Sequence, residues 1–224
     1  AHAEGPTPVS AVLSGLLLNV AMYAVLRCKV LTDGALDNAM AGQLMMGFGL
    51  LSVTVAAFFL SRQRDVKRMF SYSSIEHMGL ITFAFGMGGP VANFAGLLHM
   101  TVHSLVKSAI FFTVGHATQK AGTQMMSEIR GLIKVSPTIG WGMMLGVMAI
   151  LGMPPFGVFA SEFLIYSGLF TDDAVGVWAK LALGGVATLL AFVGAVSALS
   201  ITRAYGVIFL GHSRDDTLPP GHEP

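Results

Sequence analysis

The sequence predicts an all-α polytopic membrane protein, a bundle of about seven helical segments, on three observations. Charged residues make up only 11% of the 224 residues, whereas a soluble domain averages about 25%. The mean hydropathy is +0.70, and 54% of the residues are hydrophobic. Apolar stretches of about the 20 residues that a helix needs to cross a bilayer recur along the chain, with little of the alternation typical of strands.

The composition also narrows the possible functions. The formal net charge of +1 gives no reason to expect nucleic acid as a partner. The single cysteine, Cys28, excludes a disulfide framework and a thiolate metal cluster within this chain. The sequence contains no Walker motif, glycine-rich phosphate loop or nucleophile elbow. We therefore expect no redox cofactor, metal or catalytic residue in the chain itself.

Seven apolar segments follow one another, separated by polar or glycine-rich connections. The expected segments are residues 8–26, 39–60, 66–87, 91–118, 137–153, 158–170 and 174–210. Residues 27–38 are predicted to form a polar connection, and 61–68 and 119–136 to form basic and mixed loops. A kink is expected in the last segment near Gly184-Gly185 or Gly194. Residues 1–210 would form the membrane domain and residues 211–224 a polar tail, and the abrupt start suggests a piece of a longer chain.

Proline-rich breaks are expected to interrupt helices inside the membrane. Residues 154–157, Pro-Pro-Phe-Gly, divide an apolar stretch into halves that are each short for a full span. One broken helix fits best, because irregular backbone is tolerated in the membrane only where it is buried or lines a cavity. Pro6 and Pro8 precede the first segment and fit either a surface loop or a similar break. Two such breaks in corresponding positions are typical of inverted-repeat transporters.

The strongest set of candidate functional residues lies in the segment 91–118. His99, His103 and Lys107 are spaced four residues apart, so they project from one side of a helix about 6 Å from one another. Histidine exchanges protons near neutral pH, and a lysine amine removed from water can do the same. A proton relay is the functional interpretation. The alternatives are histidines that hydrogen-bond across helices, a lysine that reaches the interface, or a zinc site, for which no third ligand is evident.

Two acidic residues lie in apolar surroundings. Glu162 follows the Pro-Pro break and is either a second proton carrier or a charge favoured at a helix N-terminus. Glu76 and His77 are adjacent, so they point about 100° apart and are not expected to face one path together. Of this pair, His77 is the better candidate for the interior.

Three further polar residues are open to a functional or a structural interpretation. Lys67 lies at the edge of its segment, where interfacial anchoring is the default. His116, near a membrane boundary, is either the end of a relay or a plain interface residue. Asn19 lies in the middle of the first segment and is expected to link helices.

Basic residues are uneven between alternate loops, which predicts the orientation in the membrane. By the positive-inside rule, the loops with more basic residues would be cytoplasmic, and Arg27 and Lys29 would lie on the other side of the membrane. The residues expected on the cytoplasmic side are Arg62, Arg64, Lys67, Arg68, Lys120, Arg130 and Lys134.

Four stretches resemble one known family, in order and over nearly the whole chain. They are AHAEGPTPVSAVLSGLLL, DVKRMFSYSSIEHMG, LLHMTVHSLVKSAIFFTVGH and LGMPPFGVFASEFLI. They are similar to the first broken helix, the signature helix, the His/Lys helix and the second broken helix of antiporter-like proton-translocating proteins. That family includes membrane components of complex I, Mrp-type cation/proton antiporters and membrane-bound hydrogenases. In detail the chain looks like the antiporter-like membrane components of hydrogenase-4 and formate hydrogenlyase.

The resemblance implies a multi-pass subunit of the cell inner (plasma) membrane, part of an inverted-repeat antiporter-like fold. Its partners would be the membrane and peripheral subunits of a hydrogenase or NADH-dehydrogenase-like complex. Such a subunit carries no redox centre and moves protons while electron transfer occurs elsewhere. It also implies a proton pathway over a set of matching positions: His99, His103, Lys107, Glu162, Lys67 and His77.

The chain departs from the family pattern in two ways. Asn19 stands where many complex I members carry a lysine, and the N-terminal half of the family fold is not in this sequence. Two alternatives to the proton-conducting subunit remain. The first is an Mrp-type subunit that exchanges a cation for protons, and the second is a structural scaffold without transport.

Overall fold

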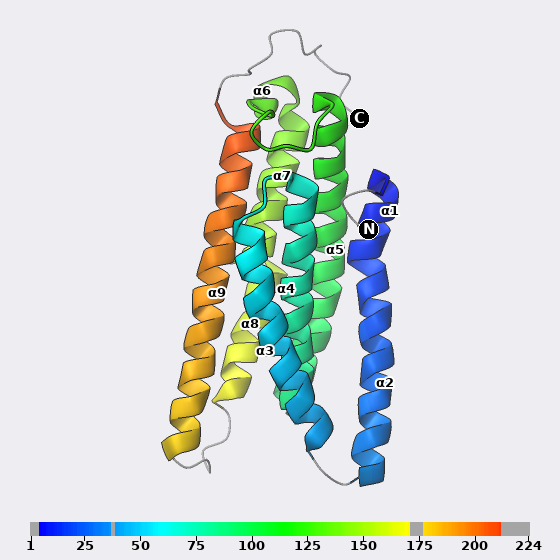
Figure 1. The fold of residues 1–224 in the computed structure, drawn as a ribbon, viewed down its shortest axis with the longest axis vertical. Coiled ribbons are helices and arrows are strands. Elements are labelled where there is room, and N and C mark those ends of the chain that lie inside the picture. Colours follow the sequence, from blue (N-terminus) through cyan, green and yellow to red (C-terminus); the bar gives the residue numbers. More distant parts are fainter. Residues whose placement is uncertain (1–4, 37–38, 171–176, 212–224) are drawn as a thin grey trace.

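The computed structural model describes residues 5–36, 39–170 and 177–211, and these residues form a bundle of long helices (Figure 1). The helices are α1 (Thr7–Val12), the π-helical turn η1 (Leu13–Leu17), α2 (Leu18–Leu36), α3 (Met40–Ser61), α4 (Val66–Met87), α5 (Gly89–Ala121), α6 (Leu132–Val135), α7 (Pro137–Ile150), α8 (Gly157–Leu169) and α9 (Val177–Phe209). The predicted all-helical class is confirmed. The predicted polar tail lies outside the described residues, apart from Gly211.

Most predicted segments agree with the helices, and local capping explains their ends. The segment 66–87 matches α4, which begins where the Asp65 side chain accepts a hydrogen bond of 2.9 Å from the Arg68 N–H. Helix α5 ends at Ala121, and its C-cap residue, Gly122, has a φ of 67°. This left-handed conformation at a helix C-terminus favours glycine.

The predicted polar connection 27–38 was wrong, because α2 continues to Leu36. Its polar residues support the helix instead of ending it. Lys29 pairs with Asp33 four residues later at 2.6 Å, and the Thr32 hydroxyl donates to the Cys28 carbonyl. Pairs at this spacing lie on one helix face and stabilise it slightly.

Pro6 and Pro8 lie at the start of the first described helix, and the choice between a surface loop and a helix break before it stays a prediction. The first helix begins at Thr7, with Pro6 as its N-cap residue, and the prolines occupy positions where no intrahelical donor is needed. The irregularity lies further on, in the π-helical turn η1. Such turns are frequent at functional sites.

The broken helix at the Pro-Pro segment is confirmed. Helix α7 ends at Ile150 and α8 begins at Gly157, and the two follow one another along the bundle (Figure 1). In contrast, α9 is one continuous helix through Gly184, Gly185 and Gly194, and the kink expected there stays a prediction.

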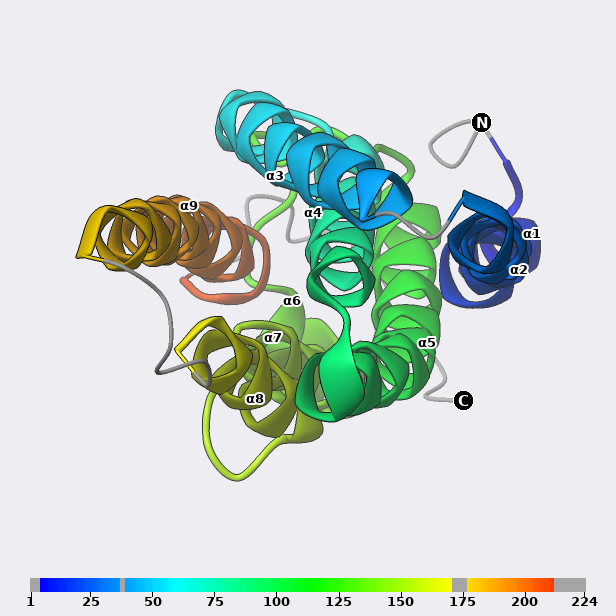
Figure 2. The same cartoon turned by 90° about the horizontal axis from the view of Figure 1, so that it is seen from below.

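Helix α4 lies at the centre of the bundle, with α3, α5, α8 and α9 around it and α1–α2 beyond α5 (Figure 2). Among the described residues, four stretches are long and apolar enough to cross a membrane: Thr7–Ala35, Met40–Ser61, Gly89–Ala121 and Lys180–Phe209. Large apolar side chains such as Phe48, Phe58 and Leu199 are exposed on the outside of the bundle. The ionisable side chains in the middle of α4 and α5 are buried, as expected for a polytopic membrane protein: Glu76, His77, His99, His103 and Lys107.

The two predicted basic loops meet at one end of the bundle. The Met126 N–H donates to the Arg64 carbonyl at 2.9 Å, and the Val66 N–H donates to the Gln124 carbonyl at 3.1 Å. Helix α2 carries Arg27 and Lys29 toward the opposite end (Figure 1). The uneven charge seen in the sequence is therefore a difference between the two ends of the molecule.

Candidate functional site

The three-residue ladder of α5 lies in the interior. His99, His103 and Lys107 have no exposed surface. Steps of four residues along the helix separate them by about 6 Å each. The predicted alignment on one helix face is confirmed, and this face is directed at α4.

His99 joins three helices through a chain of hydrogen bonds. Its Nε2 lies 2.9 Å from His77 Nδ1 on α4, and its Nδ1 lies 2.9 Å from the Ser161 hydroxyl on α8. The Ser161 hydroxyl donates to the Val158 carbonyl at 2.8 Å. Because the one hydroxyl proton of Ser161 is used in that bond, Ser161 must accept from His99, so His99 carries its proton on Nδ1. His99 Nε2 is then an acceptor, and His77 Nδ1–H donates to it. The unprotonated Nε2 of His77 is left as an acceptor.

Lys107 contacts α4 one turn of its own helix beyond His103. Its Nζ donates to the Phe70 carbonyl at 3.2 Å and lies 5.6 Å from the centre of the Phe70 ring. The Ser74 hydroxyl donates to the same carbonyl at 3.1 Å and lies 2.6 Å from the Ser14 hydroxyl in η1. Lys107 is thus held between α4 and α5 rather than reaching a membrane interface.

His103 lies between Lys107 and the histidine pair. Its ring centre is 5.6 Å from that of His77. Both ring nitrogens are buried, and neither has a hydrogen-bond partner among the described residues. Since an unpaired buried polar atom costs about 1–3 kcal/mol, an internal water is the natural partner for these nitrogens.

Two carboxylates lie next to His77. Glu76, His77, Glu162 and Tyr166 line one small cavity of about 50 Å³ together with apolar side chains of α3, α4 and α9. The expectation that Glu76 and His77 could not face one path was wrong. Helix α4 is surrounded on several sides, so residues 100° apart can both reach the interior. The sequence reasoning preferred His77 and missed Glu76, although a carboxylate within an apolar segment was a signal that could have identified it.

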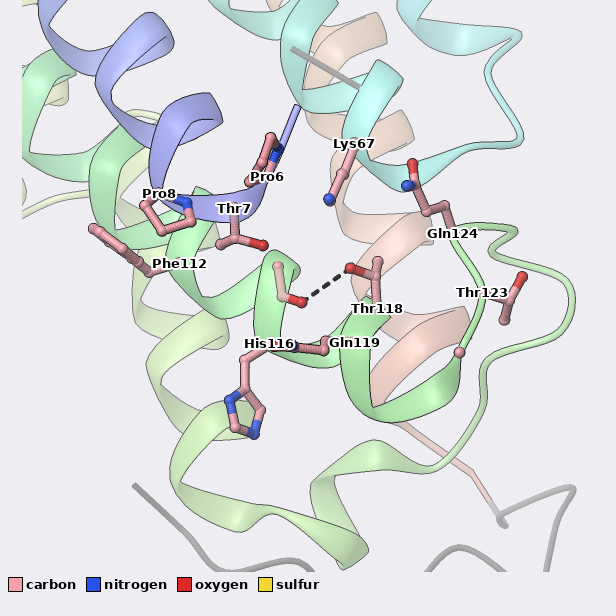
Figure 3. Close-up of a pocket in the computed structure, with 12 residues that line it drawn as sticks. Pro6, Thr7, Pro8, Lys67, Phe112, His116, Thr118, Gln119, Thr123 and Gln124 are labelled. Atoms are coloured by element: carbon pink, nitrogen blue, oxygen red, sulfur yellow. Dashed lines mark hydrogen bonds between the residues drawn. The ribbon is translucent and has the colours of Figure 1, made fainter. Parts of the chain in front are cut away.

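Lys67 and His116 lie apart from this cluster. They line a larger pocket of about 780 Å³ at the end of the bundle that carries the basic loops, beside Thr7 and Gln119 (Figure 3). Lys67 is 10 residues from His77 on α4, which corresponds to about 15 Å along the helix. Lys67 is nonetheless largely buried rather than an exposed interfacial anchor.

Asn19 links helices, as expected. Its side-chain amide donates to the Met100 carbonyl at 3.1 Å and to the Ser104 hydroxyl, both on α5. Asn19 therefore ties α2 to the helix that carries the ladder.

The fold also assembles a set of possible metal ligands that sequence spacing did not reveal. His77, His99 and Glu162, from three different helices, each offer a ligand atom within 4.8 Å of the others. Two imidazoles and a carboxylate suit a divalent transition metal. A metal between the histidines would replace their direct hydrogen bond, whereas the present contacts with Ser161 already satisfy His99.

Comparison with known proteins identifies the family. Residues 1–191 match the family described as NADH:quinone oxidoreductase/Mrp antiporter, TM. The chain belongs to this family. A curated relative, the hydrogenase-4 component F homolog of Methylacidiphilum infernorum, is 54% identical over 193 residues, which cover 86% of this chain and 40% of the relative. The resemblance predicted from the motifs is confirmed.

Solved structures confirm the fold. The chain is similar to the membrane-bound sulfane sulfur reductase, an archaeal respiratory membrane complex, with a TM-score of 0.85, 27% identity and coverage of 99% of this chain and 44% of the other. It is also similar to a chain of the Mrp complex from Dietzia sp., with a TM-score of 0.84, 21% identity and coverage of 98% and 39%. The protein is therefore an antiporter-like, multi-pass membrane protein. It spans two fifths of the length of its curated relative, 40% by this alignment.

Proposed function

We propose that this chain conducts protons across the cell inner (plasma) membrane as part of a larger subunit. That subunit would belong to a hydrogenase-4, formate hydrogenlyase or NADH-dehydrogenase-like complex, in which electron transfer takes place elsewhere. Residues 1–210 would form its antiporter-like membrane domain. The assignment to such a complex is carried over to this chain from relatives whose names describe hydrogenase-4 and formate hydrogenlyase components.

The buried polar series at the centre of the bundle carries the proposal. Lys107, His103, His77 and His99 lie between helices whose outer surfaces are apolar, and Glu162 faces the cavity beside His77. Ionisable groups inside a membrane are expensive, so a row of them on facing helices marks an ion or proton path. The His77–His99 hydrogen bond lets a proton pass from ring to ring by a change of tautomer, without movement of the backbone.

Lys67 is proposed as a proton carrier at the end of the bundle with the basic loops. It lines the large pocket there, one helical turn before Phe70, whose carbonyl accepts from Lys107. A proton entering from the pocket would pass Lys67 and then Lys107 before it reaches the histidines. The pocket is the place where water can approach the buried series.

The test is proton pumping by the whole complex reconstituted in lipid vesicles. We expect Lys107→Ala and Glu162→Gln to reduce proton uptake by about tenfold or more, since a positioned proton carrier contributes at least that much. Lys180→Ala serves as the matched control, because this lysine lies at the exposed end of α9 and outside the series. Assembly is followed by size-exclusion chromatography of the purified complex.

The two alternatives give different results in the same assay. Unchanged pumping by both variants in a correctly assembled complex would support a structural scaffold and contradict the proposal. Transport that requires sodium, and continues as sodium movement when protons are held at equilibrium, would support an Mrp-type antiporter subunit instead.

A further inference from the structure

Glu76 is a buried carboxylate that the proton path described above does not use. Its side chain is only 8% exposed and lies in the central helix α4. One carboxylate oxygen, Oε1, accepts a hydrogen bond of 2.5 Å from the Ser197 hydroxyl on α9. The other, Oε2, is buried and has no partner among the described residues. A carboxylate that needed only to join α4 to α9 would not leave half of its acceptors unused.

The surroundings of Glu76 offer a route for a proton. The cavity of about 50 Å³ that it lines also contacts His77 and Glu162. This volume is sufficient for at least one water molecule, and polar partners for that water are present on several sides. His77 has a free acceptor at Nε2 if the tautomers follow the Ser161 hydrogen bond. A water in the cavity can therefore connect His77 to either carboxylate.

We propose that Glu76 is a second proton acceptor of the pathway, so that the path divides at His77 into an α8 branch ending at Glu162 and an α9 branch through Glu76 and Ser197. This inference rests on the proposed proton conduction. On the α9 branch, an N–H bond of protonated His77 breaks and an O–H bond forms on the Glu76 carboxylate through one water. His77 becomes neutral, Glu76 becomes a neutral carboxylic acid, and no electrons are exchanged. To restore the carboxylate, the Glu76 O–H bond breaks as its proton passes to the Ser197 oxygen, while the Ser197 hydroxyl gives its own proton to a water molecule on the α9 side.

The two branches lead to different helices. Glu162 lies on the second half of the broken helix, whereas Ser197 is a buried hydroxyl in the long helix α9. Figure 2 shows the α8 and α9 ribbons next to each other beside α4, and residues of both helices line the cavity. A proton on Glu76 is hydrogen-bonded toward α9, whereas a proton on Glu162 lies on α8.

The decisive variant is Glu76→Gln in the complete complex. Glutamine keeps an oxygen that can accept from Ser197, but it cannot exchange a proton. A purely structural role predicts that the variant pumps normally, whereas the proposal predicts that proton pumping falls by about tenfold or more at unchanged assembly. Glu76→Asp, which keeps the titratable group, should recover part of the rate.

Infrared difference spectroscopy supplies a readout that packing changes would not produce. Turnover of the wild-type complex should give a carboxylic acid C=O band that Glu76→Gln removes. Ser197→Ala should shift this band to higher wavenumber, because the carbonyl loses its hydrogen bond. Ser200→Ala is the matched control, since the Ser200 hydroxyl donates to the Val196 carbonyl within α9 and should leave the band in place.

Normal pumping by an assembled Glu76→Gln complex, or persistence of the assigned band in that variant, would overturn the inference. These outcomes distinguish failure of the inference from failure of the proposed function. If Lys107→Ala loses pumping and Glu76→Gln pumps normally, the proposed proton conduction stands and only the α9 branch is excluded. A wild-type complex that moves no protons removes both.

Discussion

Ser161 determines how His99 is oriented between its neighbours. The hydroxyl accepts from His99 Nδ1 at 2.9 Å while it donates to the Val158 carbonyl in the first turn of α8. The partner of one ring nitrogen decides which tautomer of a histidine is present. Ser161 therefore acts on the relay through His99, as a positioning residue beside Glu162.

Replacement of Ser161 by alanine should weaken both stability and proton transfer. The buried His99 Nδ1–H would lose its acceptor, which costs about 1–3 kcal/mol of unfolding free energy. The ring would also be free to adopt the other tautomer, which reverses the direction of the hydrogen bond with His77 and removes the fixed starting orientation of the relay. Unfolding of the purified protein in detergent measures the first effect and vesicle pumping the second.

Thr101→Val is the control for this prediction. The Thr101 hydroxyl donates to the Leu97 carbonyl within α5 and is exposed, on the side of the helix away from the ladder. Thr101→Val should change neither the free energy of unfolding nor the rate of proton pumping appreciably. Equal stability and pumping in Ser161→Ala and the wild-type protein would show that the serine does not position His99.

The ladder could be predicted from the sequence, but its partners could not. Regular spacing places His99, His103 and Lys107 on one helix face whatever the rest of the chain does. Ser161 and Ser197 are ordinary small residues in apolar segments, and only the packing of α8 and α9 brings them to His99 and Glu76. Side-chain direction within one helix was likewise a poor guide to Glu76, because α4 is enclosed by several helices.

Helices α3 and α4 approach closely along a series of glycines. A Cβ atom added at Gly49 would lie 2.7 Å from the Gly79 carbonyl oxygen and 2.7 Å from the Phe83 nitrogen. Small residues that allow backbones to meet are the usual basis of tight helix packing in membranes. This contact fixes the position of the central helix and with it the positions of Glu76 and His77.

Gly49→Ala should therefore separate α3 from α4 and destabilise the bundle. Neither neighbouring backbone atom can move without shifting a helix, so we expect a loss of about 1–3 kcal/mol. Gly47→Ala, two residues away, meets nothing within 4 Å and should be neutral or stabilising by about 0.5–1 kcal/mol, as is usual when alanine replaces glycine in a helix. Thermal unfolding in detergent compares the two. A Gly49→Ala protein as stable as Gly47→Ala would contradict the proposed role of the contact.

Helix boundaries were predictable where a local signal ends the helix. Asp65 before α4 and Pro137 at the start of α7 fix two of them. The end of α2 was misjudged because charged residues were interpreted as a loop, although Lys29 and Asp33 are spaced as a helical ion pair. The π-helical turn η1 has no signal of its own in the sequence and depends on packing against α4 and α5.

The whole bundle is asymmetric between its two ends. The loop before α4 and the loop after α5 are joined by backbone hydrogen bonds, so their basic residues form one charged end. The large pocket with Lys67 and His116 opens at this end. Under the positive-inside rule this end faces the cytoplasm, which places the pocket on the side from which protons would enter.

Cysteine labelling in cells tests this orientation in the full-length protein. The native Cys28, which is exposed, is first replaced by serine. Ser61→Cys then marks the basic end. Gly34→Cys marks the opposite end, at a position where an added Cβ atom meets nothing within 4 Å. A membrane-impermeant thiol reagent should label Gly34→Cys in intact cells and label Ser61→Cys only after permeabilisation. The reverse pattern would place the pocket outside the cytoplasm, and Lys67 would then lie where protons leave rather than where they enter.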